Sequence, residues 1–212
     1  AACAISALNT SCNPLWPSKT GEEYKKSMYD CATLAGLLGV KKIVAMAGLP
    51  AGSETDTTPN WITSTVSWPD FMAPAYEYQW KVTIEFWNEF IAHCKKCGIE
   101  HIAIEEFPGT MVWSASTLLK LREATDPMLG INLDPSHMMV LGADRSRLLA
   151  HSRAAFSTFT VRMPVSSAVW QTPTVCSSLA PLPSPLTVYG TMLQSAAARI
   201  SSGGRNSSLF AT

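Results

Sequence analysis

Two acidic residues and one histidine are spaced so that their side chains could hold a divalent cation. Glu105 ends the apolar run "IAIE", and Asp134 ends the run "INLD" further along the chain. His137 follows Asp134 by three residues, in the motif "LDPSH". Carboxylate oxygens and an imidazole together suit Mn²⁺, Mg²⁺, Co²⁺ or Zn²⁺. We therefore predict a metal site formed by Glu105 and Asp134, with His137 beside it.

The same residues also have purely structural interpretations. Asp134 could close a turn with Ser136 through an Asx hydrogen bond, and Glu105 could pair with a lysine. Glu106 is left out of the predicted site because side chains alternate along a strand, which points Glu106 away from Glu105.

Strands and helices must position these residues, and the first 144 residues alternate between the two patterns. We expect strands at 5–8, 40–46, 101–105 and 130–134. We expect helices that begin with Thr20 as N-cap and end at Gly39, that cover Tyr76–Cys94 and end at Gly98, and that cover 114–124. This alternation predicts an α/β fold with a parallel sheet, either doubly wound or part of a (β/α)₈ barrel.

The segments that follow the predicted strands favour a site at the carboxyl ends of the strands over a dinucleotide-binding site. No glycine-rich turn follows a strand, so dinucleotide binding has no support. Barrels carry their chemistry at the carboxyl ends of strands, where Glu105 and Asp134 both fall.

Charge and hydropathy limit the partners of the chain. All sixteen acidic residues lie within residues 1–144 with ten basic ones, a formal charge of −6, whereas residues 145–212 carry six dispersed arginines. Arginines without a cluster or aromatic platform do not predict a nucleic-acid partner. No apolar run reaches the roughly 18 residues of a membrane span, so no membrane partner is expected. The first residues lack the basic region of a signal peptide and read like mid-strand, so we expect a segment upstream to be missing.

The six cysteines show no paired spacing. This indicates a reducing compartment, and we predict a cytoplasmic protein. Cys94 and Cys97 form the only close pair, at the end of a helix, where the dipole disfavours a thiolate. We interpret this pair as structural.

Four segments together carry a resemblance to a known family. They are "ISALNTSCNPLWP", "EFWNEFIAHCKKCGIEHIAIEEFPG", "TLLKLREA" and "GINLDPSHMMVLGAD". They resemble the sugar phosphate isomerase/epimerase family, which has a xylose isomerase-like TIM barrel. The resemblance implies that residues 1–144 form a partial barrel of about strands three to six. It also implies that Glu105 and Asp134 are the first two ligands of a divalent metal. His137 is then a substrate contact or, as in the related apurinic endonucleases, a metal ligand.

The resemblance implies a metal-dependent isomerase or epimerase that moves a proton between adjacent carbons of a ketose or polyol. Its partner is a small sugar or sugar phosphate, and a homo-oligomer is possible for the full-length parent. Glu105 is the catalytic residue, acting as ligand and base, while Asp134 is a ligand only. Trp61 and Trp68, with Phe71, offer an apolar lid over a sugar face, although they could simply cap the barrel rim.

Two other functions stay open. An apurinic endonuclease-like phosphodiesterase shares the Asp-x-x-His motif, but it needs many histidines and the chain has four. The chain could also be a non-catalytic fragment. Because it holds about half of a barrel, we expect weak metal affinity, poor solubility and no turnover from it.

Residues 145–212 change in character to a low-complexity tail rich in Ser, Ala, Pro and Arg. Back-translated one base earlier, residues 155–164 permit "IFHVHGKDAR", which is close to the family's seventh strand and its metal-binding histidine. The same shift returns the missing acidic residues. We therefore predict a frameshift at about Asp144, with a genuine disordered tail as the alternative. The domains are accordingly predicted as 1–144, a partial barrel, and 145–212, an aberrant tail.

Overall fold

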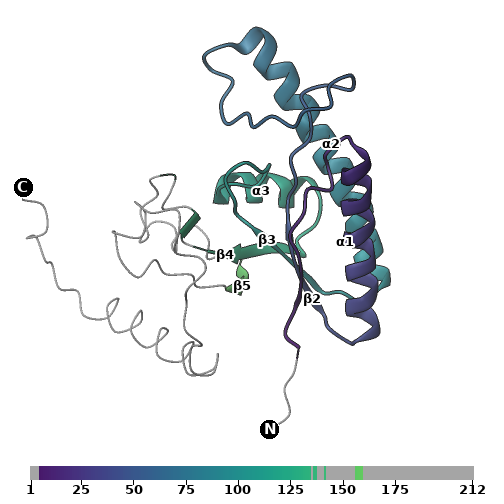
Figure 1. The fold of residues 1–212 in the computed structure, drawn as a ribbon. Helices are drawn as coiled ribbons and strands as arrows, with labels where there is room; N and C mark the ends of the chain where they lie inside the picture. Colours follow the sequence, from purple (N-terminus) through teal and green to yellow (C-terminus); the bar gives the residue numbers. More distant parts are fainter. Residues whose placement is uncertain (1–4, 135, 138–140, 142–155, 160–212) are drawn as a thin grey trace, which may run out of the picture. The chain divides into compact units, whose positions relative to one another are not determined.

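Strands and helices alternate along the chain (Figure 1). The computed structural model describes residues 5–134, 136–137, 141 and 156–159. All of them belong to one compact unit, residues 1–163, and the second unit, 164–212, lies outside the described residues. The elements, in chain order, are β1 (Leu8–Thr10), α1 (Lys19–Leu37), β2 (Lys42–Met46), α2 (Pro69–Lys96), β3 (His101–Glu105), α3 (Ala115–Ala124), β4 (Leu129–Leu133) and β5 (Phe156–Phe159).

The strands form one parallel sheet in the consecutive order β1-β2-β3-β4-β5. A doubly wound sheet reverses its strand order, whereas a barrel adds each new strand on the same side. Parallel crossovers are almost always right-handed, so consecutive order places the helices on one face. The fold is therefore α/β and an arc of a (β/α)₈ barrel, which decides between the two folds that the sequence left open. The strands predicted at 40–46, 101–105 and 130–134 are confirmed to within two residues. The first strand, predicted at 5–8, lies instead at Leu8–Thr10, because its pairing with β2 begins only at Leu8. β5 adds a strand beyond the four predicted.

The hydrophobic core lies between the sheet and the helices. Alternate strand residues such as Ile43, Ile104 and Ile131 are fully buried in it. They pack with helix residues that include Met28 and Trp87. The Trp87 ring nitrogen also donates to the carbonyl of Ala47 at 3.1 Å, which fixes α2 against the end of β2. In Figure 1, α1 and α2 run side by side along the sheet.

The opposite face of the sheet is the inner face of the barrel arc. Val44 and Ala103 pair in register and are buried, but they lie outside the helix-facing core. The register then places Met46 beside Glu105 at the carboxyl ends of β2 and β3. This face carries the modest side chains of Val44 and Ala103 within the strands and the polar Glu105 at the strand end. It is therefore suited to a site at the mouth of the barrel.

Two helix starts differ from their predictions. Helix α1 is capped by Ser18, whose side chain accepts from the backbone N–H of Gly21 at 3.0 Å, so the prediction of Thr20 as N-cap is wrong. Both residues have the right chemistry, but the chain becomes helical two residues earlier. Helix α2 begins at Pro69 rather than Tyr76 and contains Pro74. Proline at the start of a helix costs no hydrogen bond, which permits the early start.

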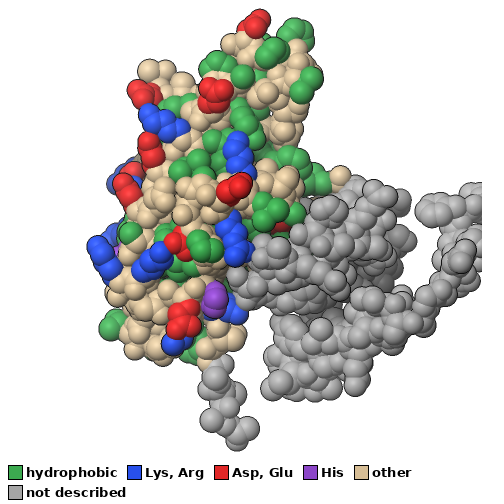
Figure 2. All heavy atoms as spheres, turned by 180° about the vertical axis from the view of Figure 1, so that it is seen from behind, with side chains coloured by type: hydrophobic (Ala, Val, Ile, Leu, Met, Phe, Trp, Pro, Cys, Tyr) green, Lys and Arg blue, Asp and Glu red, His purple; other side chains and the backbone are tan. Residues whose placement is uncertain are grey.

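The surface of the described part carries charges of both signs. On the face that Figure 2 shows, basic and acidic side chains are interspersed rather than gathered by sign. Within the described residues, no helix combines the length and apolar character needed to cross a membrane. The cysteines at 12, 31, 94 and 97 are all free thiols, and burial raises the pKa of Cys94 to about 12.

Candidate metal centre and adjoining pocket

Glu105 and Asp134 lie side by side because their strands are neighbours. Glu105 is the last residue of β3, and Asp134 directly follows β4, which pairs with β3 in parallel. His137 stands three residues after Asp134, and its backbone N–H donates to the Asp134 carbonyl at 3.2 Å. This short turn brings the imidazole back over the strand ends.

The three side chains converge on one point. The Nε2 atom of His137 lies 2.9 Å from Oε1 of Glu105 and 3.6 Å from Oδ2 of Asp134. One ligand atom from each residue lies within 4.8 Å of the other two. Two carboxylates and one imidazole at this separation fit a divalent cation, because the set offers three donors without a cationic side chain.

Asp134 is buried and held in place by its neighbour. Its Oδ1 atom accepts from the backbone N–H of Ser136 at 3.0 Å and from the Ser136 hydroxyl at 2.6 Å. The Asx hydrogen bond considered as an alternative to metal binding is therefore present, but it uses Oδ1 and leaves Oδ2 facing His137. The two interpretations are compatible.

Glu106 differs sharply from the residue before it. The alternation of the strand puts Glu106 on the helix-facing side with Ile104, where it is 1 % exposed. Neither of its carboxylate oxygens has a hydrogen-bond partner among the described residues, and burial raises its pKa to about 7. Glu106 is absent from the group of converging donor atoms. Its omission from the predicted site agrees with this geometry.

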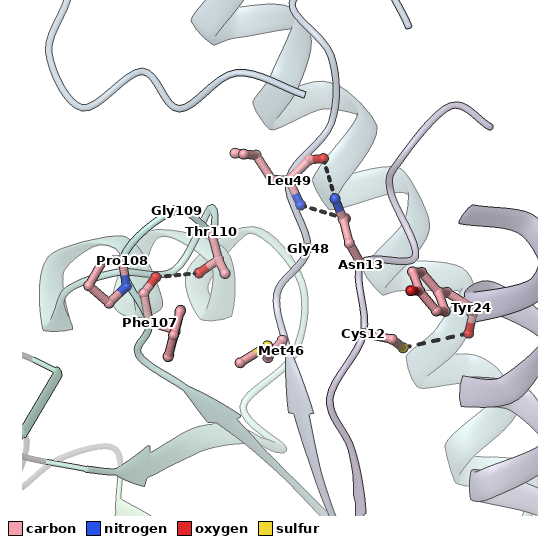
Figure 3. Close-up of a pocket in the computed structure, with 10 residues that line it drawn as sticks. All are labelled: Cys12, Asn13, Tyr24, Met46, Gly48, Leu49, Phe107, Pro108, Gly109 and Thr110. Atoms are coloured by element: carbon pink, nitrogen blue, oxygen red, sulfur yellow. Dashed lines mark hydrogen bonds between the residues drawn. The ribbon is translucent and has the colours of Figure 1, made fainter. Parts of the chain in front are cut away.

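A pocket of about 340 Å³ opens at the carboxyl-terminal side of the sheet (Figure 3). Its lining comes from the last residue of β2 and the segments that follow β1, β2 and β3, with one residue from α1. The lining residues are Cys12, Asn13, Tyr24, Met46, Gly48, Leu49, Phe107, Pro108, Gly109 and Thr110. The ring of Phe107 contacts the ring of His137 with centroids 4.4 Å apart, so the pocket borders the candidate metal centre.

Hydrogen bonds between loops fix the walls of this pocket. The Asn13 side chain donates to the Leu49 carbonyl at 2.9 Å and accepts from the Leu49 N–H at 2.8 Å. Gly48 has a φ of +83°, and a Cβ there would come within 2.8 Å of the Leu15 side chain. Because only glycine fits this close approach, the loops after β1 and β2 pack directly on each other.

The loop after β3 forms the opposite wall. The N–H of Thr110 donates to the Phe107 carbonyl at 3.2 Å, and Gly109 has a φ of +82°. Proline followed by glycine at the centre of such a turn is typical of type II, which needs a positive φ at its third residue. The N–H of Met111 donates to the Gly48 carbonyl at 2.9 Å and links this wall to the loop after β2.

Comparison with known proteins places the fold in a family. Residues 3–163 match the family described as xylose isomerase-like TIM barrel. The chain belongs to this family. The match continues past residue 144 and includes β5.

A bacterial protein is similar to this chain in sequence. The chain is 46 % identical over 141 residues to the uncharacterized protein YfiH of Bacillus subtilis (strain 168). The aligned part is 66 % of this chain and 45 % of that protein, so the chain spans less than half of its relative's length.

Solved structures of the xylose isomerase-like fold resemble the described barrel arc. An L-ribulose 3-epimerase matches with a TM-score of 0.54 and 14 % identity, over 73 % of this chain and 49 % of the other. A xylose isomerase-like TIM barrel protein from Mycobacterium smegmatis, in complex with magnesium, matches with a TM-score of 0.52 and 14 % identity, over 74 % of this chain and 50 % of the other. At these identities the likeness concerns the fold.

The two tryptophans predicted to bind substrate lie apart from the pocket of this TIM barrel. The Trp61 ring packs edge-on against Trp113 with centroids 5.9 Å apart. Trp68 is 63 % exposed and stacks on Phe71 at 6.4 Å. Neither tryptophan is among the residues that line the pocket. Their role as a lid stays a prediction.

Several pocket residues of the TIM barrel escaped the sequence analysis. Tyr24 belongs to the first helix, and helices of a barrel usually supply packing rather than site residues. Asn13 lies in the polar loop "NTSCNP", and that polarity was the available signal. Met46 could have been found from its place at the end of β2, by the rule that identified Glu105.

Proposed function

We propose that the chain carries the metal-binding half of a sugar isomerase or epimerase. The observation that supports this best is the convergence of Glu105, Asp134 and His137 at the carboxyl edge of a parallel barrel sheet. Membership of the xylose isomerase-like family and the similarity to an L-ribulose 3-epimerase support a small sugar as the substrate.

Glu105, Asp134 and His137 are the proposed ligands of a divalent cation such as Mn²⁺, Mg²⁺, Co²⁺ or Zn²⁺. The magnesium complex of the Mycobacterium smegmatis relative supports a metal in this fold. When bound, such a cation acts as a Lewis acid toward substrate oxygens and so makes the adjacent C–H bond more acidic.

In the proposed reaction Glu105 takes the proton from that carbon. A carboxylate at the end of a barrel strand is held rigidly, and general bases work best when they are fixed within reach of the proton. Nε2 of His137 and Oε1 of Glu105 lie 2.9 Å apart, so both atoms can ligate the same cation, which would hold Glu105 in place. Phe107 packs against His137 and covers one side of it. A second group must return the proton to the neighbouring carbon.

The phosphodiesterase alternative lacks support from the histidines. His93 contacts Cys97 and Thr33 between α1 and α2, and His101 begins β3 at the end far from Glu105. Within the described residues, only His137 reaches the converging donor atoms. His151 lies outside the described residues.

Location and further partners stay predictions. Free thiols are the reason to expect the cytoplasm. The formal charge of −6 over residues 1–144 is the reason not to expect a nucleic-acid partner. The homo-oligomer of the full-length parent is likewise a proposal.

Binding of Mn²⁺ to this chain tests the metal centre. Glu105→Gln removes one charged ligand atom, so we expect the dissociation constant of Mn²⁺ for this variant to be at least tenfold higher than for the wild type in a calorimetric titration. Glu106→Gln is the matched control, because it makes the same substitution one residue later at a side chain outside the converging group. It should leave the dissociation constant within twofold of the wild type.

Two results would contradict the assignment. Equal Mn²⁺ affinity in the wild type and Glu105→Gln would remove Glu105 from the ligands. A larger loss in Glu106→Gln than in Glu105→Gln would place the ion on the helix side of β3. Far-ultraviolet circular dichroism of each variant separates loss of a ligand from loss of folding.

A further inference from the structure

The pocket beside the metal centre is placed to hold one end of a substrate whose reacting carbons lie at Glu105. Met46 pairs in register with Glu105, and Phe107 contacts His137, so both residues connect the pocket to the converging side chains. A volume of about 340 Å³ lies at the small end of the range for ligand pockets, roughly 300 to 1,000 Å³.

Most polar side chains in the lining already form hydrogen bonds within the protein. Both polar atoms of the Asn13 amide bond to the backbone of Leu49. The Thr110 hydroxyl lies 2.9 Å from the carbonyl oxygens of both Phe107 and Val112, so its single proton is shared between two acceptors in the protein. The Cys12 thiol donates to the Tyr24 carbonyl at 3.7 Å.

The Tyr24 hydroxyl is the exception. In Figure 3 no hydrogen bond joins it to the other residues that line the pocket, and Tyr24 is 38 % exposed. The phenol can therefore donate to or accept from a sugar hydroxyl without breaking a bond within the protein.

The lining also lacks a group that holds phosphate. None of its ten residues is a lysine, arginine or histidine. Proteins hold phosphate with Arg or Lys or with the N–H groups at a helix start. The pocket is instead walled by Met46, Leu49 and Phe107. The ionisable groups beside it are Glu105, Asp134 and His137, which are the proposed ligands of the cation and so are not free to hold a phosphate. A phosphate in the pocket itself would find no cationic side chain in the lining, which is unfavourable for its charge.

We infer that this pocket takes an uncharged end of the substrate, so that the sugar carries no phosphate on that end, and that Tyr24 hydrogen-bonds to one of its hydroxyls. The inference rests on the proposed function and narrows it from sugars and sugar phosphates in general. The apolar walls then pack against the carbon chain, while the Tyr24 phenol selects a hydroxyl.

Competition between free and phosphorylated ketoses tests the inference in the Mn²⁺-loaded chain. The probes are D-tagatose, D-tagatose 1-phosphate and D-tagatose 6-phosphate, measured by calorimetry. We expect at least one monophosphate, the one whose phosphate would enter the pocket, to bind at least tenfold more weakly than the free sugar. If neither monophosphate binds more weakly, the inference is wrong.

Leu49→Lys should bind the monophosphate more tightly than the wild type does. A variant that failed to fold would instead lose binding, so the two effects can be told apart. A lysine at this wall should neutralise the phosphate charge, so we expect the affinity for the weakly bound monophosphate to rise at least tenfold. Leu37→Lys is the control, because Leu37 is 82 % exposed at the far end of α1. An unchanged affinity of both monophosphates in Leu49→Lys would overturn the assignment of the pocket.

Tyr24→Phe tests the hydrogen bond separately. Loss of one neutral hydrogen bond should weaken D-tagatose binding about five- to tenfold. Tyr78→Phe on α2 is the matched control and should leave binding unchanged. If Mn²⁺ binding depends on Glu105 but D-tagatose does not respond to Tyr24→Phe, the inference fails while the metal centre stands. If Mn²⁺ does not bind at all, the proposed function fails as well.

Discussion

Asp134 divides its two carboxylate oxygens between different neighbours. Oδ1 accepts two hydrogen bonds from Ser136, and Oδ2 faces Nε2 of His137. Because Oδ1 is anchored, the carboxylate cannot rotate freely, and Oδ2 is held toward the proposed ion. Hydrogen bonds that orient a ligand in this way contribute strongly to metal affinity.

Replacement of the anchoring hydroxyl should therefore weaken the metal centre. We expect Ser136→Ala to raise the Mn²⁺ dissociation constant about tenfold, because Asp134 loses the 2.6 Å bond from the Ser136 hydroxyl that helps to orient it. Ser27→Ala, on the exposed side of α1, is the control and should have no effect. Calorimetric titration measures both. An unchanged constant in Ser136→Ala would mean that Asp134 needs no anchor.

The residues at the site differ in how far the sequence could predict them. Glu105 and Asp134 could be predicted from the sequence because neighbouring parallel strands end at the same edge of a sheet. Their convergence with His137 follows from a turn of only three residues. Tyr24 could not be predicted as a pocket residue, because its place in the pocket depends on how α1 packs against the loop after β1. Periodicity along a helix says which face is buried, but not what lies opposite.

At the scale of elements, α1 shows that two capping residues can compete for the same helix. Ser18 caps the helix in the structure, although Thr20 with Glu23 also has the pattern of a capping box. The N–H of Ser18 donates to the Trp16 carbonyl at 2.8 Å, so the chain turns directly before Ser18. Sequence pattern predicts the existence of the helix well and its first residue less well.

A pair of substitutions tests which residue caps α1. Ser18→Ala should lower the free energy of unfolding by about 1 kcal/mol, because it leaves the N–H of Gly21 without its partner. Thr20→Ala should be neutral or slightly stabilising, since alanine is the better helix former within the first turn. Urea denaturation measures both values. A larger loss from Thr20→Ala would restore Thr20 as the cap.

A second inter-element contact ties the end of α2 to the turn before β4. Lys95 pairs with Asp126 at 2.5 Å, and Asp126 also accepts from the N–H of Met128 at 2.8 Å. The hydrogen bond from Lys95 and the neighbouring charges hold the pKa of Asp126 below its ordinary value of 3.8. A depressed carboxyl pKa stabilises the fold above the unfolded pKa and loses that effect as the pH falls through the folded pKa.

Asp126→Asn should therefore destabilise the protein in a pH-dependent way. We expect a loss of about 1 kcal/mol at pH 7 that shrinks below about pH 4, where the wild-type carboxyl also becomes protonated. Asp30→Asn is the control, because the Lys26–Asp30 pair is exposed on both sides and should contribute less. Denaturation at several pH values gives both differences. A loss from Asp126→Asn that is independent of pH would exclude an electrostatic cause.

At the scale of the whole molecule, composition and alternation were enough to predict an α/β arc but not its choice of fold. Alternating strands and helices are common to doubly wound sheets and barrels. The strand order decides between them, and it appears only in the pairing. The resemblance to a known family favoured the barrel, and the consecutive order confirms it.

The predicted frameshift concerns residues that lie mostly outside the described part of the chain. β5 is described, and its backbone pairs with β4 so that Phe159 stands opposite Leu133, one residue before Asp134. In the shifted reading a histidine falls near residue 159, which would place it at the edge that carries Glu105 and Asp134. The frameshift stays a proposal. Sequencing of the coding DNA checks it, and an uninterrupted frame through codon 144 would exclude it.

The consecutive strand order also bears on how the chain acquires its structure. Each strand pairs with the one completed just before it, and from β1 to β4 each crossover contains a single helix. The sheet can therefore grow from its amino-terminal edge while the rest of the polypeptide is still leaving the ribosome, and no early strand must wait for a distant partner. A ribosome-bound chain arrested after β3 should already protect the β2–β3 amides from hydrogen exchange.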